Sequence, residues 1–180
     1  LGIGFTQRLQ GEYTTALNTL QQGLSLAETS GFKAEVLNYF INLSAVYEAQ
    51  KQFTLMLDYA QRAASLARRL SSPLPLAQAL SRVGQAQVAL QQPQLAQSAF
   101  EEAIATIESM RANVAGGTTE QQQFFADKIA PYHGLSQLLV TQKNSAAAFL
   151  YAERAKSRAL LDVLTTGQPN LSKAMTAAEQ

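Results

Sequence analysis

Apolar residues recur along the chain at spacings of three and four residues, which is the periodicity of a helix with one buried face. Val36, Phe40, Leu43 and Tyr47 fall on one such stripe, which we expect to be buried. Strict alternation of apolar and polar residues, which is typical of a half-buried strand, is absent over windows of strand length. The pattern therefore predicts an all-α chain. Helices are expected near residues 1–9, 12–29, 33–50, 53–70, 74–91, 94–114, 119–142 and 145–165.

Turn-forming residues separate these windows. Gly11 and Gly31 stand where a helix should end, and Pro73 and Pro93 stand where a helix should begin. Pro131 interrupts the seventh window, so that this helix should be kinked or divided there.

The same residue types recur at a fixed interval, so that position 3 aligns with positions 43 and 83. Small side chains at the aligned positions let antiparallel helices approach closely. In the second copy a large and a small residue exchange places, which keeps the packed volume nearly constant. We therefore expect one array over 1–165, with repeats near 1–30, 31–71, 72–117 and 118–165, and a linker or a following segment over 166–180. The aligned sets are Ile3, Leu43 and Val83; Gly4, Ser44 and Gly84; Ala16, Met56 and Ala96; Leu20, Ala60 and Phe100; and Gly23, Ala63 and Ala103.

The rhythm Leu43-Ser44…Tyr47…Ala60…Ala63, and the segment NLSAVYEAQKQF over 42–53, resemble the tetratricopeptide repeat. The period of 40 is similar to the long-helix subclass found in kinesin light chain and in the Pins-type polarity adaptors. This resemblance implies an α-α superhelix of about four helix pairs, in which the first helices line a concave groove. It also implies a scaffold for protein–protein interaction and no catalysis.

A second resemblance is narrower. The segment AFLYAERAKSRALLDVL over 148–164 is similar to the last repeat helix of bacterial proteins that join such repeats to a C-terminal CHAT domain. It implies that a further domain follows in the same polypeptide. The catalytic residues of such a domain have no counterpart in this chain.

Composition excludes several classes of function. Fourteen Lys and Arg residues against thirteen Asp and Glu residues give a net charge of +1, which does not suit a protein that follows nucleic-acid phosphates. The chain has no cysteine and one histidine, so thiolate chemistry and multi-histidine metal sites are excluded. No constellation of catalytic residues and no cofactor motif stands out, so we expect neither an enzyme nor a cofactor.

No apolar run approaches the roughly 18 residues that a membrane span needs, and no signal peptide is visible. We therefore expect no membrane partner and a cytoplasmic location. The chain begins at Leu1 rather than at Met, and we expect a piece of a longer protein whose exposed end helix, with Ile3 and Phe5, favours self-association.

Polar residues follow the buried stripe on the predicted first helices of the second, third and fourth copies and would face the groove. Amide side chains both donate and accept, which suits the backbone of an extended peptide, and an arginine suits a carboxylate. Within the family resemblance, an Asn at the place of Asn42 often binds peptide. Alanines share this stripe, among them Ala45, Ala49 and Ala89. The predicted partner-binding residues are Asn38, Asn42, Gln78, Arg82, Gln85, His133 and Gln137.

Each of these residues has a structural alternative. Asn38, Asn42, Gln78 and Arg82 are better explained as solvated groove residues than as ligand contacts, with Arg82 the stronger candidate for a contact. His133 is better explained as an exposed or capping residue than as a ligand. Arg154, Lys156 and Arg158 are flanked by acidic residues and are best explained as a solvated helix face.

Two functions follow. The first is an interaction scaffold that holds a peptide or a partner domain in the concave groove. The second is a regulatory or sensor arm of a larger multidomain protein, of a CHAT-type protease or a signalling kind. A small-molecule sensor built on helical repeats is a third.

Overall fold

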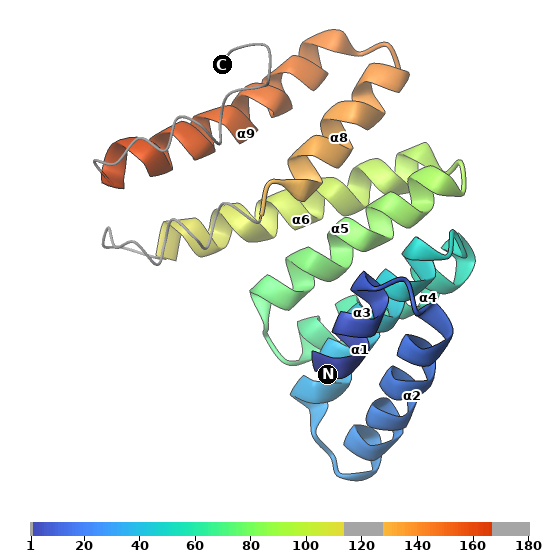
Figure 1. Cartoon of the computed structure of the whole chain (residues 1–180). Coiled ribbons are helices and arrows are strands. Elements are labelled where there is room, and N and C mark those ends of the chain that lie inside the picture. Colours follow the sequence, from blue (N-terminus) through green and yellow to red (C-terminus); the bar gives the residue numbers. More distant parts are fainter. Residues whose placement is uncertain (1, 114–127, 167–180) are drawn as a thin grey trace. The chain divides into compact units, whose positions relative to one another are not determined.

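The computed structural model describes residues 2–113 and 128–166, and the described residues are almost entirely helical (Figure 1). Most helices begin and end close to the expected positions. The helices are α1 (Gly2–Leu9), α2 (Tyr13–Thr29), α3 (Lys33–Ala49), α4 (Phe53–Arg69), α5 (Pro73–Ala89), α6 (Pro93–Asn113), α8 (Ala130–Thr141) and α9 (Ser145–Thr166).

The seventh expected helix, over 119–142, is the exception. Residues 119–127 lie outside the described residues, and residues 128 and 129 are not helical. Helix α8 begins at Ala130 and carries Pro131 in its first turn, where a missing N–H costs nothing. The expectation was a kink or a division of the helix at Pro131. Among the described residues, a helix begins next to this proline.

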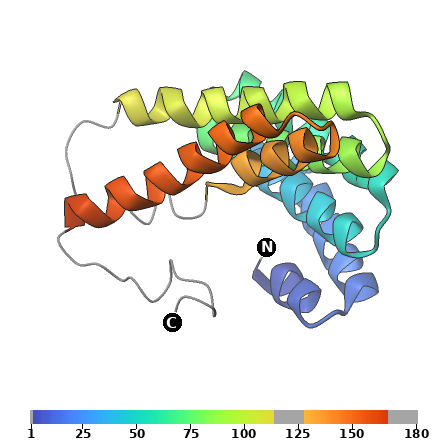
Figure 2. The same ribbon diagram turned by 90° about the horizontal axis from the view of Figure 1, so that it is seen from above.

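The chain divides into two compact units, Leu1–Met110 and Arg111–Gln180. In the first unit each helix packs on the next from α1 to α5, and α3 also packs on α5. Both views show consecutive helices of this unit running in opposite directions (Figures 1 and 2). In the second unit α8 and α9 form an antiparallel hairpin.

Helix length in the first unit is constant. Helices α2, α3, α4 and α5 each have 17 residues. Together with α6 they begin at positions 13, 33, 53, 73 and 93, so that one helix and its turn always occupy the same length of chain. The longer repeat seen in the sequence, from position 3 to 43 and 83, is therefore two successive helix-and-turn units.

One turn geometry is used throughout. Residues 11, 31, 51, 71 and 91, which follow the same interval, all have positive φ. After α2, the N–H of Phe32 donates to the carbonyl of Ala27 at 2.9 Å and the N–H of Gly31 donates to that of Glu28 at 3.2 Å. These two bonds form a Schellman motif, which satisfies the last carbonyls of the helix. The turns after α3, α4 and α5 repeat both bonds.

The core of the first unit follows the small-residue positions. The buried stripe Val36, Phe40, Leu43 and Tyr47 is confirmed, with each residue at most 9% exposed. A Cβ atom placed on Gly84 would lie 2.6 Å from the ring of Phe100, so α5 has room for this phenylalanine only because residue 84 is glycine.

The three copies vary this contact in a consistent way. Gly4 meets Leu20 in the first copy as Gly84 meets Phe100 in the third. The second copy has Ser44 and Ala60 at the same two positions, and both are fully buried. A larger residue on one helix is thus matched by a smaller residue on the other.

The second unit has its own small core. Tyr132, Leu135 and Leu139 of α8 are buried, as are Ala148 and Ala155 of α9. The hydroxyl of Ser136 donates to the carbonyl of Ala148 at 3.0 Å and ties the two helices together. Tyr132 is a packing residue, since only 2% of it is exposed.

The turn geometry gives a first prediction. Gln91 has φ 57°, a conformation that strains a side chain by about 1 kcal/mol or more. Gln91→Gly should therefore raise the free energy of unfolding by about 0.5–1 kcal/mol in urea denaturation. Gly31→Ala is the matched control, because its φ is +74° and an added Cβ would meet nothing within 4 Å. Gly31→Ala should lower the free energy of unfolding by a similar amount. A change of the same sign in both variants would contradict the interpretation.

The Gly84–Phe100 contact gives a second prediction. Gly84→Ser alone should overpack the interface and cost about 1–3 kcal/mol, and Phe100→Ala alone should leave a cavity and cost about 3–5 kcal/mol. The double variant reproduces the Ser44 and Ala60 combination, so its loss should be smaller than the sum by about 1–3 kcal/mol. Denaturant unfolding of all four proteins measures this coupling energy. Strict additivity would show that the two positions do not compensate.

Candidate functional site

Five of the seven predicted partner-binding residues lie on two neighbouring helices of the first unit. Asn38 and Asn42 are on α3, and Gln78, Arg82 and Gln85 are on α5, which packs on α3. We call these five residues the first-helix stripe. Asn38 and Gln78 are exposed and the other three are half-buried.

The other two predicted residues belong to the second unit. His133 and Gln137 lie one turn apart on one face of α8, and both are exposed. They form a surface of the second unit and are not members of the first-helix stripe.

The expectation for one alanine on the groove side of α3 is wrong. Ala45 was assigned to the groove side of its helix, but only 4% of it is exposed. The reason is that α3 packs on α5 as well as on α2 and α4, so the side of α3 that carries Ala45 is covered. Ala49 and Ala89, near the ends of α3 and α5, are exposed as expected.

Within the stripe, Asn42 and Arg82 already have partners. The amide nitrogen of Asn42 donates to the backbone carbonyl of Asn38 at 2.8 Å, one turn earlier in α3. Nη1 of Arg82 donates to Oε2 of Glu48 at 2.6 Å. The carboxylate that the sequence led us to expect opposite Arg82 is thus provided by the protein itself.

The Glu48–Arg82 pair is one of three ion pairs with the same sequence separation. Glu28 pairs with Arg62 at 4.0 Å and Arg68 pairs with Glu102 at 2.7 Å. The first members of the three pairs, at positions 28, 48 and 68, follow the interval of the helix starts, and so do their partners at positions 62, 82 and 102. We call these pairs the ion-pair ladder.

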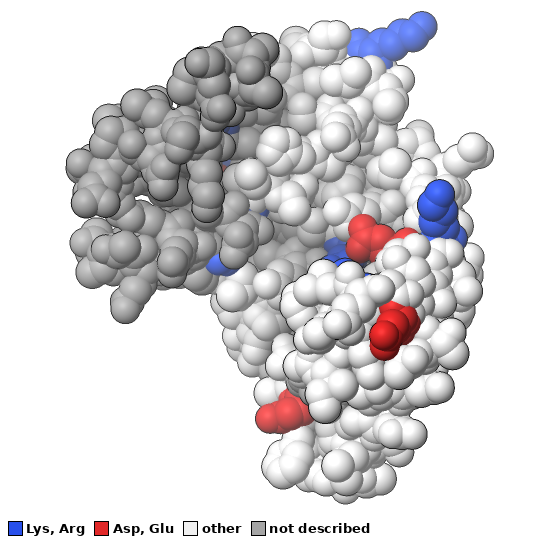
Figure 3. All heavy atoms as spheres, in the orientation of Figure 1, with Lys and Arg blue, Asp and Glu red and all other residues white. Residues whose placement is uncertain are grey.

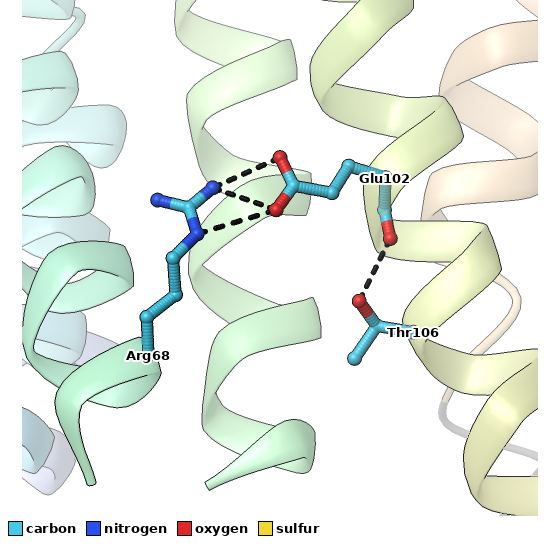
Figure 4. A network of polar contacts seen from close by, with 3 residues as sticks. All are labelled: Arg68, Glu102 and Thr106. Atoms are coloured by element: carbon cyan, nitrogen blue, oxygen red, sulfur yellow. Dashed lines mark hydrogen bonds and ion pairs between the residues drawn. The ribbon is translucent and has the colours of Figure 1, made fainter. Parts of the chain in front are cut away.

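The ladder connects every second helix. Helix α2 is joined to α4, α3 to α5, and α4 to α6. Figure 4 shows the last of these, in which Arg68 and Glu102 approach from two helices. Nη2 of Arg68 donates to both carboxylate oxygens, at 2.7 and 2.9 Å, while Nε lies 3.3 Å from one of them. Thr106 donates to the backbone carbonyl of Glu102 and not to its carboxylate.

The common separation has a geometric origin. The residue of α5 that is equivalent to Glu48 of α3 is Val88, yet Glu48 pairs with Arg82. The arginine thus lies more than one turn, or about 9 Å along the axis, before the equivalent position. The sequence carried this signal as acidic and basic residues at matching intervals, but the offset cannot be chosen without the stagger between helices.

The two adjacent acidic residues of α6 have separate partners. Glu101 accepts from Gln97 at 2.9 Å, whereas Glu102 belongs to the ladder through Arg68. The two neighbouring carboxylates therefore point to different partners on two sides of α6.

One position continues the ladder without an ion pair. Arg8 lies one interval before Glu28, so it would be the first member of a further pair. The corresponding partner position is occupied by Asn42, which has no charge. Nε of Arg8 is buried and has no hydrogen-bond partner among the described residues. Its guanidinium lies 5.1 Å from the centre of the Phe5 ring. The series of ladder positions thus begins on α1 with a cation that has no carboxylate partner among the described residues.

An aromatic cluster supports the helices behind the stripe. The rings of Tyr47 and Tyr59 stack with centres 5.4 Å apart, and Phe40 lies 6.2 Å from Tyr59. Burial raises the pKa of Tyr47 above its ordinary value of 10.0, and the neighbouring Tyr59 raises it further. The phenol of Tyr47 therefore stays neutral, as a buried packing residue should.

The two basic residues of α9 whose side chains are described, Arg154 and Lys156, have different contacts. Lys156 pairs with Glu153 at 3.5 Å, and the guanidinium of Arg154 lies 5.4 Å from the centre of the Tyr151 ring. The side chain of Arg158 lies outside the described residues. On the face shown in Figure 3, the charged side chains of the described residues are sparse and the two signs are mixed.

Within residues 2–113 and 128–166, no group of three or more His, Asp or Glu side chains is placed to hold a metal ion. No helix described by the structure is both long enough and apolar enough to span a membrane.

Comparison with known proteins assigns the fold. Residues 32–109 match the family model of the tetratricopeptide repeat. Among solved structures, BtubC (BKLC) from P. vanneervenii is similar to this chain over 87% of its length, with a TM-score of 0.71 and 18% sequence identity. The chain spans 60% of the length of that structure. No curated protein matches the chain.

The class of the protein is therefore an all-α superhelix of paired helices. More narrowly, residues 32–109 match the family model of the tetratricopeptide repeat. Repeats of this family generally mediate protein–protein interaction, and they are typically not catalytic.

The ion-pair ladder gives a third prediction. Arg68→Glu and Glu102→Arg should each cost up to about 1 kcal/mol, because each sets like charges against one another. The double variant, which has the polarity of Glu28–Arg62, should recover most of this loss. The recovery should shrink at high salt, where exposed charges are screened. Urea unfolding measures all four proteins.

Arg69→Glu is the control for this cycle, since Arg69 is adjacent to Arg68 and has no ion-pair partner among the described residues. It should cost less than Arg68→Glu. A double variant no more stable than the worse single variant would contradict the ladder.

Proposed function

We propose that the protein is an interaction scaffold that binds an extended, acidic peptide segment of a partner along the first-helix stripe. The observation that carries this proposal is the arrangement of Asn38, Asn42, Gln78, Arg82 and Gln85 on two adjacent first helices. The family to which residues 32–109 are matched generally serves protein–protein interaction.

The amide side chains suit a peptide backbone. Asn38 and Gln78 are exposed and occupy equivalent positions in successive repeats, on α3 and α5. Each amide donates and accepts, and can pair with one peptide group of an extended chain. The spacing of the two helices would set the spacing of the two contacts.

The charges suit an acidic segment. Arg82 uses only Nη1 on Glu48, which leaves further donors of its guanidinium for a second carboxylate. Arg8 adds a cation that has no carboxylate partner among the described residues. In this proposal Glu48 has two effects: it holds the Arg82 side chain in place, and its charge weakens the attraction of Arg82 for an acidic ligand.

A fourth prediction follows, with a peptide library displayed on phage as the probe. Peptides selected on the wild-type chain should bind Asn42→Ala and Arg82→Ala at least about tenfold more weakly if each loses a buried polar contact. Glu48→Gln should bind acidic peptides more tightly, because it removes the competing charge. Asn18→Ala, at an exposed position of α2, should bind as the wild type does.

Binding that is unchanged in both Asn42→Ala and Arg82→Ala would refute the proposed site. Tighter binding in Asn42→Ala alone would refute the role of the amide.

A second candidate function is the regulatory arm of a larger protein, in which α9 contacts a domain that follows in the chain. Phe149 and Leu150, in the segment that resembles repeats preceding a CHAT domain, are 67% and 56% exposed. Exposed apolar neighbours of this size are a sign of a docking surface. Phe149→Ser in a longer polypeptide would then alter the activity of that domain without unfolding α9.

A further inference from the structure

A pocket of about 360 Å³ lies in the first unit, away from the first-helix stripe. It is formed by the last turn of α2, the turn at Gly31, the first half of α3 and the last turn of α4. Its walls are mainly apolar. The apolar residues that line it are Ala27, Val36, Phe40, Leu66 and Leu70.

The wall of this pocket is held in place by the fold. Phe40 is only 6% exposed, and the guanidinium of Arg62 lies 4.3 Å from the centre of its ring. Arg62 in turn lies between the carboxylates of Glu28 and Asp58, at 4.0 and 3.9 Å. The pocket is thus formed before any ligand arrives, which lowers the cost of binding.

Three charged residues line the same pocket: Glu28, Lys33 and Arg69. Glu28 belongs to the ion-pair ladder through Arg62. Lys33 and Arg69 are exposed, and neither has a carboxylate partner among the described residues. The free charge at the pocket is therefore positive, although the chain as a whole is nearly neutral.

This combination defines the chemistry of a ligand. Small-molecule sites are pockets of about 300–1,000 Å³ with mostly apolar walls and a few polar groups that fix orientation. A lysine and an arginine at the rim select a carboxylate, with which they form charge-assisted hydrogen bonds. We propose that this pocket binds a small carboxylate with a compact apolar body, its apolar part against Phe40 and Leu66 and its carboxylate between Lys33 and Arg69.

The probe is sodium 4-phenylbutyrate, titrated into the whole ¹⁵N-labelled chain and followed by two-dimensional NMR. A ligand of this size in an open pocket should have a dissociation constant on the order of a millimolar. The amide signals that move should be those of the pocket, including Gly31, Lys33 and Leu70. Movement centred on the first-helix stripe instead would overturn the assignment.

Ligand controls test the two parts of the proposal. 4-Phenylbutan-1-ol has the same apolar body without charge, and 4-phenylbutylamine has the opposite charge. Both should bind about three- to tenfold more weakly than the acid, given the strength of two exposed charge pairs. Acetate, which lacks the apolar body, should not bind. Equal binding of the acid and the alcohol would remove the role of the two cations.

Protein controls use exposed positions, so that folding is preserved. Lys33→Glu combined with Arg69→Glu should weaken 4-phenylbutyrate binding at least about threefold. Lys51→Glu combined with Lys143→Glu changes the net charge by the same amount at two turns that do not line the pocket, and it should leave binding unchanged. The same loss in both double variants would show a general charge effect and overturn the site.

Two further arms separate the alternatives. The tripeptide Gly-Gly-Phe presents a phenyl ring and a carboxylate at a peptide C-terminus. If the tripeptide binds and 4-phenylbutyrate does not, the pocket is a peptide site and the small-molecule proposal is overturned. Arg82→Ala should leave 4-phenylbutyrate binding unchanged. The proposed peptide site on the first-helix stripe and the proposed ligand site in the pocket are therefore tested independently.

Discussion

The constraint on which the first unit depends is the repetition of one helix length followed by one Schellman turn. Each turn reverses the chain with the same two hydrogen bonds and one residue at positive φ. Because the length never varies from α2 to α5, every helix presents the same positions to its neighbours. The stripe, the small-residue contacts and the ion-pair ladder all follow from this register, and a single inserted residue would shift each of them onto another face.

The ladder shows how the register acts on charge. Ion pairs between exposed side chains are individually weak, yet three of them join parallel helices at the same offset. The third has the opposite polarity to the first two, with Arg68 where Glu28 and Glu48 stand. The geometry therefore requires opposite charges at the two paired positions, and not a particular residue at either one. The same holds in the core, where a glycine meets Leu20 or Phe100 and a serine occurs with Ala60.

Much of the fold could be predicted from the sequence, because helix periodicity and turn residues are local signals. Residues on a single stripe of one helix, such as Phe40 and Leu43, were correctly placed in the core. Ala45 was not, because its burial depends on α5, which begins only at Pro73. The ladder was missed for the same reason: its offset depends on the stagger between helices. The pocket was missed because its lining comes from three helices and a turn, and no period in the sequence connects them.

Pairing, more than net charge, determines where this protein can attract an anion. The chain carries almost equal numbers of acidic and basic residues, which suggests no preferred ligand charge. In the first unit, however, Arg62, Arg68 and Arg82 are neutralised by the ladder, whereas Arg8, Lys33, Lys51 and Arg69 have no carboxylate partner among the described residues. Free positive charge is therefore found on α1, at the turn that carries Lys51, and at the pocket between α2, α3 and α4. An unpaired cation gives up no internal partner when it binds a carboxylate, whereas Arg82 must share its guanidinium with Glu48.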